Sequence, residues 1–457
     1  MTPFDLPPRA PGSALRLLAT NDLLGRVVPL PASWGAGGSA HGVAQLLEHA
    51  QAAGPALWVD SGDLAAGGPD ALFGGRALTD MAALPIAAAA AGNHEFDDGV
   101  AAARAIAARL PFPLLCADRD AGLPGSVLLD TPAGPLGAVG VTHPAAHRFA
   151  AAPAPPADAT QRVVDAARAL RADGARWVVA LLHDGATWWA TGDPARPVAT
   201  RTGALAAATV GWAGSVDAIL GGHTFGAWRG TLHGVPAGHA HPYAATVLVV
   251  DLPDPPARPT IHPPVRVPSA EPPAATAATR AIAEAAATPV GQLDAPWTSR
   301  PGARRYLPEL VARTMRAATG ADAALVPSSQ LFTQAPLDGA AAALRAGPLS
   351  ELELELLFPF VPDALTIVEL APGELERLRS RHDLAADPAN LVDDRWWNWA
   401  RAPAGVACAV ADPRTLAVHP WFVPLLGAWL GREPATQPAA IGARQALREA
   451  LREPLAA

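Results

Sequence analysis

Five short polar motifs stand where apolar stretches of the chain end, and each contains a side chain that can bind a metal ion. They are Thr20-Asn21-Asp22, Asp60-Ser61-Gly62-Asp63, the GNHEFDDG string of residues 92–99, His183-Asp184-Gly185 and Gly221-Gly222-His223. Carboxylate, amide and imidazole groups coordinate divalent ions at about 2.0–2.2 Å when rigid elements make them converge. The motifs therefore predict a metal centre whose candidate ligands are Asp22, Asp63, Asn93, His183 and His223.

The stretches before these motifs have the length and composition of buried strands, and helix-like segments lie between several of them. The expected strands are Leu15–Ala19, Ala56–Val59, Ile86–Ala91, Leu114–Cys116, Leu136–Val141, Trp177–Leu182 and Val216–Leu220. The expected helices are Gly42–Ala53, Gly99–Leu110 and Thr160–Asp173, the last with Thr160 as its N-cap. This alternation predicts an α/β domain, in which ligands bind at the carboxyl ends of the strands.

The length of 457 residues favours two domains. Proline is dense between residues 253 and 273, which predicts an extended linker. We expect a first domain at residues 12–252, a linker at 253–280 and a second domain at 281–457. In the second domain the pattern predicts helices at Tyr306–Thr319 and near Ser350–Leu356, and strands at Ala323–Val326 and Leu365–Leu370.

The composition excludes several classes of function. The net charge is −8 and no long basic stretch occurs, so a nucleic-acid polymer is not expected as a partner. The two cysteines, Cys116 and Cys408, have no metal-ligand spacing. The sequence contains no apolar run of about 20 residues, the length that a membrane span needs. The N-terminus also lacks the pattern of a signal peptide, so we expect a cytoplasmic protein. The sequence does not indicate the oligomeric state.

The order of the five motifs resembles that of the calcineurin-like metallophosphoesterases, and GNHEFDDG is similar to the 5'-nucleotidase branch, which includes UDP-sugar hydrolases and 2',3'-cyclic phosphodiesterases. The resemblance runs from about Leu15 to Leu378. It implies an N-terminal four-layer α/β/β/α sandwich, followed by a smaller C-terminal α/β domain of the 5'-nucleotidase type. It also implies two divalent ions about 3.5–4 Å apart.

The resemblance assigns the ligands of the two ions differently. Asp63, Asn93, His183 and His223 would hold one ion. The partner ion would share Asp63 and take Asp22 and two histidines, but this chain has Leu24 and Phe225 at the histidine positions. We therefore expect one ion of manganese, zinc, cobalt or a similar metal. The partner ion could be absent, loosely bound or held by substitutes, for which His239 and His241 are candidates.

The same resemblance gives roles to three further residues. His94, oriented by Asp97, would stabilise the phosphoryl oxygens, and Phe360 could stack on a nucleobase. The nucleoside-recognition block is replaced by the string PSSQL at residues 327–331, which lacks the family's arginine. The prediction is a metal-dependent phosphoric ester hydrolase acting on a nucleotide or related small phosphoester. The alternative is a catalytically reduced family member that binds a ligand or partner.

Overall fold

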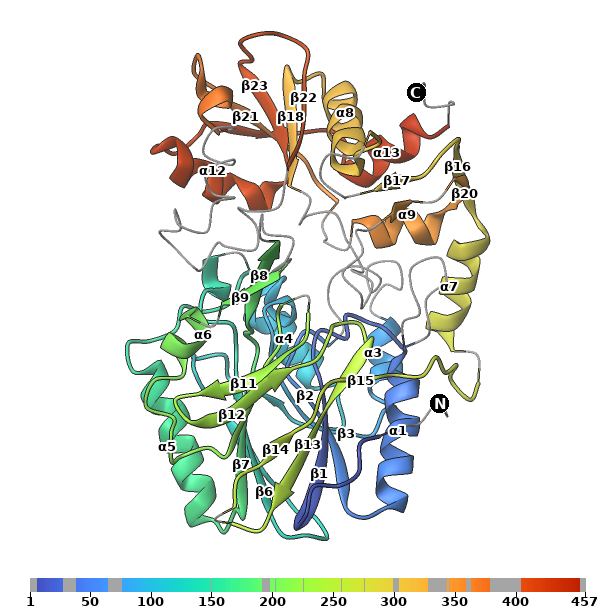
Figure 1. Ribbon diagram of the computed structural model, residues 1–457. Coiled ribbons are helices and arrows are strands. Elements are labelled where there is room, and N and C mark those ends of the chain that lie inside the picture. Colours follow the sequence, from blue (N-terminus) through green and yellow to red (C-terminus); the bar gives the residue numbers. More distant parts are fainter. Residues whose placement is uncertain are drawn as a thin grey trace. The chain divides into compact units, whose positions relative to one another are not determined.

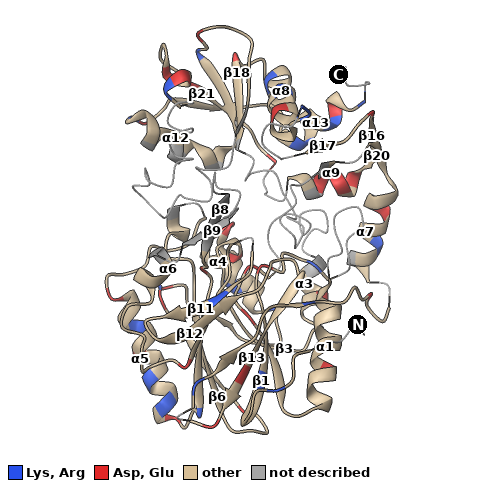
Figure 2. Ribbon diagram, viewed as in Figure 1, with Lys and Arg blue, Asp and Glu red and all other residues tan. Residues whose placement is uncertain are grey.

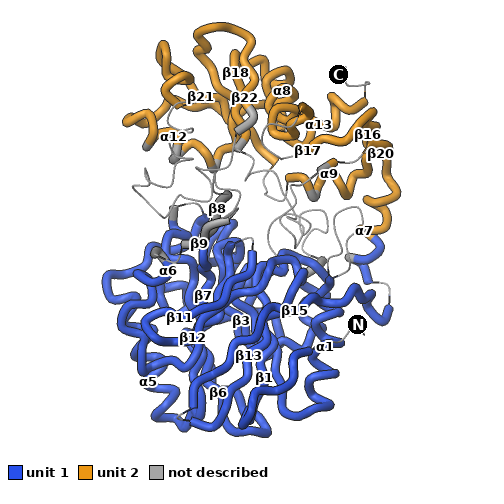
Figure 3. The backbone as a smooth tube through the Cα atoms, viewed as in Figure 1, with its two compact units in different colours: residues 1–280 blue, residues 281–457 orange. Residues whose placement is uncertain are grey.

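The computed structural model describes residues 6–27, 38–64, 76–148, 150–190, 198–201, 203–224, 226–255, 257–274, 276–298, 304–327, 343–344, 346–358, 363–378 and 404–452. The chain forms two compact units, Met1–Arg280 and Ala281–Ala457 (Figure 3). Among the helices in the described ranges, none is long and apolar enough to cross a membrane.

Two mixed β-sheets form the centre of the first unit (Figure 1). The first has the order β14 (Thr260–Ile261), β13 (Thr246–Pro253), β1 (Ser13–Thr20), β2 (Ala56–Asp60), β3 (Ile86–Ala90) and β4 (Leu114–Leu115). The second has the order β11 (Trp228–Leu232), β12 (Val235–His239), β10 (Ala218–Leu220), β7 (Trp177–Leu182), β6 (Leu136–Val141) and β5 (Ser126–Leu129). β1 to β4 run parallel, as do β6, β7, β10 and β12.

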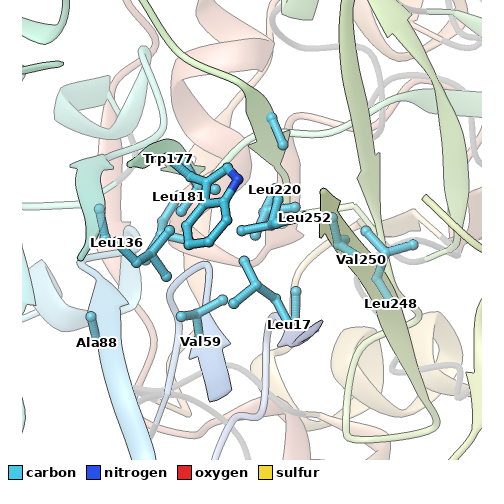
Figure 4. Close-up of a cluster of buried hydrophobic side chains, with 14 of the residues drawn as sticks. Leu17, Val59, Ala88, Leu136, Trp177, Leu181, Leu220, Leu248, Val250 and Leu252 are labelled. Carbon is cyan, nitrogen blue, oxygen red and sulfur yellow. The ribbon is translucent and has the colours of Figure 1, made fainter. Parts of the chain in front are cut away.

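The main core lies between the two sheets (Figure 4). Its side chains come from both sheets, for example Leu17, Val59, Trp177 and Leu220. Because both faces of these strands are covered, they have continuous apolar sequences instead of alternating ones.

Helices cover the outer faces of the sheets. α1 (Ala40–Ala52) contacts β1 and β2 of the first sheet, and α5 (Ala159–Ala172) packs on the second. α4 (Gly99–Ala107) follows the short helix η2 (His94–Phe96), and α3 (Arg76–Met81) precedes β3. Figure 2 shows the basic residues of α5, whose Val163, Val164, Ala167 and Leu170 are buried. These layers give the expected α/β/β/α sandwich.

Two predictions for this unit were wrong. Residues 253–280 were expected to be an extended linker between the domains, but β14 and β15 (Val265–Arg266) within them pair with β13, and the first unit continues to Arg280. The prolines limit pairing to these two short strands, because proline cannot donate a backbone hydrogen bond. Thr160 was expected to be an N-cap, but Asp158 occupies that position and Thr160 lies inside α5.

The second unit is a smaller α/β structure. Its main sheet has the order β22 (Ala404–Cys408), β18 (Ala323–Pro327), β23 (Thr415–Val418), β21 (Thr366–Glu369) and β24 (Thr436–Pro438). α8 (Leu307–Thr319) packs on β18 and β22, and α12 (Val423–Leu430) buries Leu426 against the sheet. The described residues of this unit also form two short strand pairs, β16 (Pro289–Leu293) with β20 (Gly347–Ser350) and β17 (Trp297–Thr298) with β19 (Ala343–Leu344). They include the helices α9 (Glu351–Leu357), η7 (Pro420–Phe422) and α13 (Ala443–Ala450), as well as most of α7 (Ala277–Ala287), which begins in the first unit.

The start of α9 is fixed by two residues that are close together in the sequence. Ser350 accepts a hydrogen bond from the Glu353 backbone N–H, and the Glu353 carboxylate accepts one from the Ser350 N–H. Such a reciprocal cap satisfies two backbone donors that a helix start otherwise leaves unpaired.

Candidate metal centre

The five predicted ligand residues all follow strands of the two central sheets. Asp22, Asp63 and Asn93 come after β1, β2 and β3 of the first sheet, whereas His183 and His223 come after β7 and β10 of the second. The strands of each set are parallel, so their carboxyl ends meet at one edge of each sheet. Packing one sheet on the other brings the two edges together.

The loops after β1 and β2 are hydrogen-bonded to each other. The Asp22 N–H donates to Gly62 O at 2.9 Å, and the Leu24 N–H donates to Asp63 O at 2.9 Å. Asp22, Leu24, Asp63 and His223 all have a positive φ, between 46° and 66°. This backbone conformation costs about 1–3 kcal/mol for a residue with a side chain, and such residues cluster at active sites and ligand-binding sites.

Glycine is required at residue 92 because the backbone passes directly beside Asp63, a predicted ligand. A Cβ there would lie 2.0 Å from Asp63 Oδ1 and 2.5 Å from the Asp63 backbone nitrogen. The nitrogen is a backbone atom, and the side-chain oxygen Oδ1 is held in place because it accepts the His94 N–H at 2.8 Å. The glycine of the GNHE string therefore sets the distance between the β2 and β3 loops.

Four donor groups converge at this edge. Asp63 Oδ2 lies 3.0 Å from His183 Nε2, and Asn93 Oδ1 lies 3.2 Å from His183 Nε2 and 2.9 Å from His223 Nδ1. Ligand atoms of Asp63, His183 and His223 are all within 4.8 Å of one another. His183 Nδ1–H donates to Ser61 O at 2.7 Å, which leaves the lone pair on Nε2 facing the other donors. This set of oxygen and nitrogen donors fits a borderline divalent ion.

The electrostatics of the group also fit a cation. Burial by itself lowers the pKa of His183, but the carboxylates of Asp63 and Asp22 raise it to about 10. Burial lowers the pKa of His223 well below its usual value, and the neighbouring His143 and His183 lower it further. Without an ion, the proton on His183 Nε2 therefore supplies the positive charge that the two carboxylates favour. A bound metal ion would take the place of that proton and would also accept the lone pair of the neutral His223.

Glu95 holds the backbone of this site, and the sequence analysis did not assign it a role. Its carboxylate accepts the backbone N–H groups of Asp63, Leu64 and Gly92 at 3.0, 2.8 and 2.7 Å. Burial raises the pKa of Glu95 to about 7. No local sequence pattern indicates this role, because two of the three N–H groups belong to the loop after β2.

His94 and Asp97 form a hydrogen-bonded pair beside the donors. His94 Nδ1 lies 2.8 Å from Asp97 Oδ2, and His94 Nε2 lies 3.9 Å from Asp63 Oδ2. Burial lowers the pKa of His94, but Asp97 and Asp63 outweigh it and raise the pKa to about 10. The pair therefore presents an oriented Nε2–H donor next to the predicted ion.

The predicted site of the second ion contains fewer groups that can bind a metal. Asp22 Oδ2 accepts the Asn21 amide and the His223 backbone N–H, both at 2.7 Å, and Asp22 Oδ1 lies 4.0 Å from His183 Nε2. Asp22 thus holds the His223 loop and borders the group of donors. Leu24, at the position of one missing histidine, has an apolar side chain that is 3% exposed. Phe225, at the other position, lies outside the described residues.

The two candidate substitutes have hydrogen-bond partners outside the group of donors. His239 Nδ1–H donates to Gly226 O at 2.9 Å, and its Nε2 accepts the Ala186 N–H at 3.1 Å, so backbone groups use both ring nitrogens. His241 Nδ1 lies 3.2 Å from Thr246 Oγ1. Neither belongs to the group of potential ligands found among the described residues.

A further histidine, His143, lies at the site and was missed. It follows β6, and its ring centroid is 4.1 Å from that of His223, at an interplanar angle of 39°. The sequence signal was available, because a histidine just after a predicted parallel strand has the same position as the other candidates. Phe360, the predicted base-stacking residue, lies outside the described residues.

Residues 15–226 match the sequence profile of the calcineurin-like phosphoesterase family. A comparison with curated proteins found no match. Among solved structures, a 5'-nucleotidase precursor of Thermus thermophilus has a TM-score of 0.70 at 15% identity and covers 96% of both chains. The 5'-nucleotidase of Candida albicans has a TM-score of 0.67 at 11% identity, covering 98% of this chain and 100% of that chain.

A third similar structure is the sulfate thiohydrolase SoxB of Thermus thermophilus, in complex with glycerol. Its TM-score is 0.69 at 15% identity, with 98% of this chain and 95% of that chain covered. At these identities the likeness shows a shared fold. The sequence match places residues 15–226 in the calcineurin-like phosphoesterase family, and the structural likeness gives the chain the fold of the 5'-nucleotidases.

Proposed function

We propose that this protein hydrolyses a nucleotide or a related small phosphoester with the help of one divalent ion, held by Asp63, Asn93, His183 and His223. The observation that carries the proposal is the convergence of these four donors, with His183 held by Ser61 O and its Nε2 facing the other donors. Manganese, zinc and cobalt all suit mixed nitrogen and oxygen ligands.

A bound divalent ion would act as a Lewis acid on a phosphoryl oxygen and lower the pKa of water. The protein's own side chains donate hydrogen bonds and hold the site in place. His94, aligned by Asp97, donates its Nε2–H to the oxygen on which negative charge develops. Glu95 keeps the Asp63 and Gly92 backbones fixed, so the donors do not have to rearrange during the reaction.

The fold alone does not identify the substrate, because proteins with this fold are named for different substrates. The structurally similar SoxB is named a sulfate thiohydrolase, whereas the other two similar structures are named 5'-nucleotidases. The motif similarity to the 5'-nucleotidase branch supports a nucleotide or related phosphoester. The loss of the arginine in residues 327–331 weakens the case for a nucleoside part, so small phosphomonoesters belong in the same test.

A second candidate is a catalytically reduced family member that binds a ligand or partner. The specific observation in its favour is Leu24, a buried apolar side chain next to Asp22 where the resemblance implies a metal ligand. Without the second ion, the two-metal clamp on the attacking and leaving oxygens is lost.

One experiment separates the two candidates. The purified protein is analysed for metal content and is assayed with a chromogenic phosphate ester and a nucleotide panel, in the presence of manganese, zinc or cobalt. The hydrolase proposal expects turnover that disappears in His183→Ala and His223→Ala. A protein that retains metal but shows no turnover with any ester supports the reduced member, and a protein with neither metal nor turnover contradicts the hydrolase.

A further inference from the structure

His143 is a buried histidine that the proposed reaction has not yet used. Its ring packs against that of His223, and its Nε2 lies 3.8 Å from Oδ1 of Asp184, the residue next to His183. Its side chain is 11% exposed, close to the 9% of His94, whereas His183 is completely buried. His143 therefore has an edge accessible from outside, as His94 does, and it lies beside two of the predicted ligands.

The hydrogen bonding of His143 fixes what its ring can do. Its Nδ1 accepts the backbone N–H of Ala145 at 3.1 Å. That nitrogen must carry a lone pair, so in the neutral ring the hydrogen is on Nε2. In this state the lone pair on Nδ1 accepts the Ala145 N–H, and the other nitrogen, Nε2, carries the ring's N–H. Nε2, which lies beside Asp184, is therefore a hydrogen-bond donor and not another metal ligand.

A buried ion pair holds the His143 backbone in place. Arg119 donates from Nη2 to Asp118 Oδ2 at 2.6 Å and to His143 O at 2.9 Å. Asp118 Oδ1 accepts the Thr142 N–H at 3.0 Å, and Thr142 Oγ1 donates to Ala91 O at 2.9 Å, two residues before Asn93. The loop after β6 is thus tied to the loop that carries Asn93. A donor held in this way needs little rearrangement to stabilise an anion.

We propose that His143 is an oxyanion-binding residue that donates its Nε2–H to an oxygen of the phosphoryl group at this centre. The ligand class is a tetrahedral oxyanion, either the phosphate ester or its inorganic phosphate product. The proposal rests on the proposed function, because it assumes that the ester's phosphoryl group lies next to His223. It adds a second oriented imidazole donor to that of His94.

The test measures phosphate binding and metal binding separately from turnover. Manganese-loaded wild type and three variants are titrated with inorganic phosphate by calorimetry, and their metal content is determined. His143→Ala removes the donor, and His143→Gln supplies an amide N–H in its place. His147→Ala is the matched control, because it replaces an exposed histidine of the same loop.

We expect His143→Ala to keep the wild-type manganese content and to bind phosphate about 10- to 100-fold more weakly, as for the loss of one hydrogen bond to a charged group. His143→Gln should recover most of the affinity, and His147→Ala should match wild type. Should His143→Ala not fold, His143→Met replaces it, since Met fills a similar volume without a donor.

Three results would overturn the assignment: unchanged phosphate affinity without the imidazole, loss of manganese together with phosphate, or no phosphate binding by wild type. The proposed function fails in a different way. If manganese-loaded wild type binds phosphate through His143 but hydrolyses no ester, the hydrolase proposal is wrong and the oxyanion site stands.

Discussion

Replacing Gly92 by alanine tests whether close packing of the β2 and β3 loops builds the metal centre. The added Cβ would lie 2.0 Å from Asp63 Oδ1 and 2.5 Å from the Asp63 nitrogen, both much shorter than a van der Waals contact. Asp63 cannot move away freely, because its Oδ1 accepts the His94 N–H and its own N–H donates to Glu95. The contact must therefore be relieved by separating the two loops.

The expected cost follows from this geometry. Overpacking of a dense interior costs about 1–3 kcal/mol of unfolding free energy. Displacing the groups that orient a metal ligand weakens metal affinity by about 10- to 100-fold. Both effects should appear together in Gly92→Ala, because the same contact causes them.

The assay combines urea unfolding with calorimetric titration of manganese into the metal-free protein. Gly427→Ala is the control: a Cβ there meets Arg432 O at 3.3 Å and Pro434 Cδ at 3.4 Å, in α12 of the second unit. It should leave manganese affinity unchanged and alter stability by less than about 1 kcal/mol. Wild-type manganese affinity and stability in Gly92→Ala would refute the reasoning.

Three further predictions follow from other contacts. His94→Asn should lower kcat by about 10²- to 10⁴-fold while metal content stays unchanged, and simultaneous loss of metal would show that His94 is a ligand instead. Asp251→Asn should cost about 1–2 kcal/mol at pH 7, because Arg16 and His262 hold the pKa of the buried Asp251 down to about 2 despite its burial. Since the folded-state pKa is depressed, this stability is present above about pH 4 and disappears as the pH falls toward 2. Urea unfolding between pH 7 and pH 3 checks that trend, and a constant difference would contradict it. Leu24→His combined with Phe225→His should raise the metal content from about one to about two ions per chain, as in a two-metal site, and an unchanged content would mean that the surrounding pocket has diverged as well.

The sequence placed the candidate ligands correctly in the fold where they follow a buried parallel strand closely. Asp63, Asn93 and His183 belong to this class, since the strand pattern and the polar residue after it are both local signals. The seven expected strands of the first unit are all present, with ends that differ by a few residues. Helix α8 and strand β18 of the second unit were also predicted closely.

Apart from His143, whose signal was local, the missed features depend on partners far away in the sequence. Glu95 works through backbone N–H groups of a loop about 30 residues earlier, and no local pattern reveals that it faces them. His239 was a candidate metal ligand, but it lies at the end of β12, a strand that the sequence analysis did not predict. The proline-rich segment after β13 was read as a linker because its pairing with β13 is non-local.

The central claim is that one metal site is complete and the other is not. Metal analysis of wild type, His183→Ala and Asp22→Asn tests it most directly, because His183 belongs to the predicted complete site and Asp22 to the incomplete one. The account predicts about one ion per chain in wild type and in Asp22→Asn, and almost none in His183→Ala. Two ions in wild type, or loss of the ion in Asp22→Asn, would contradict it.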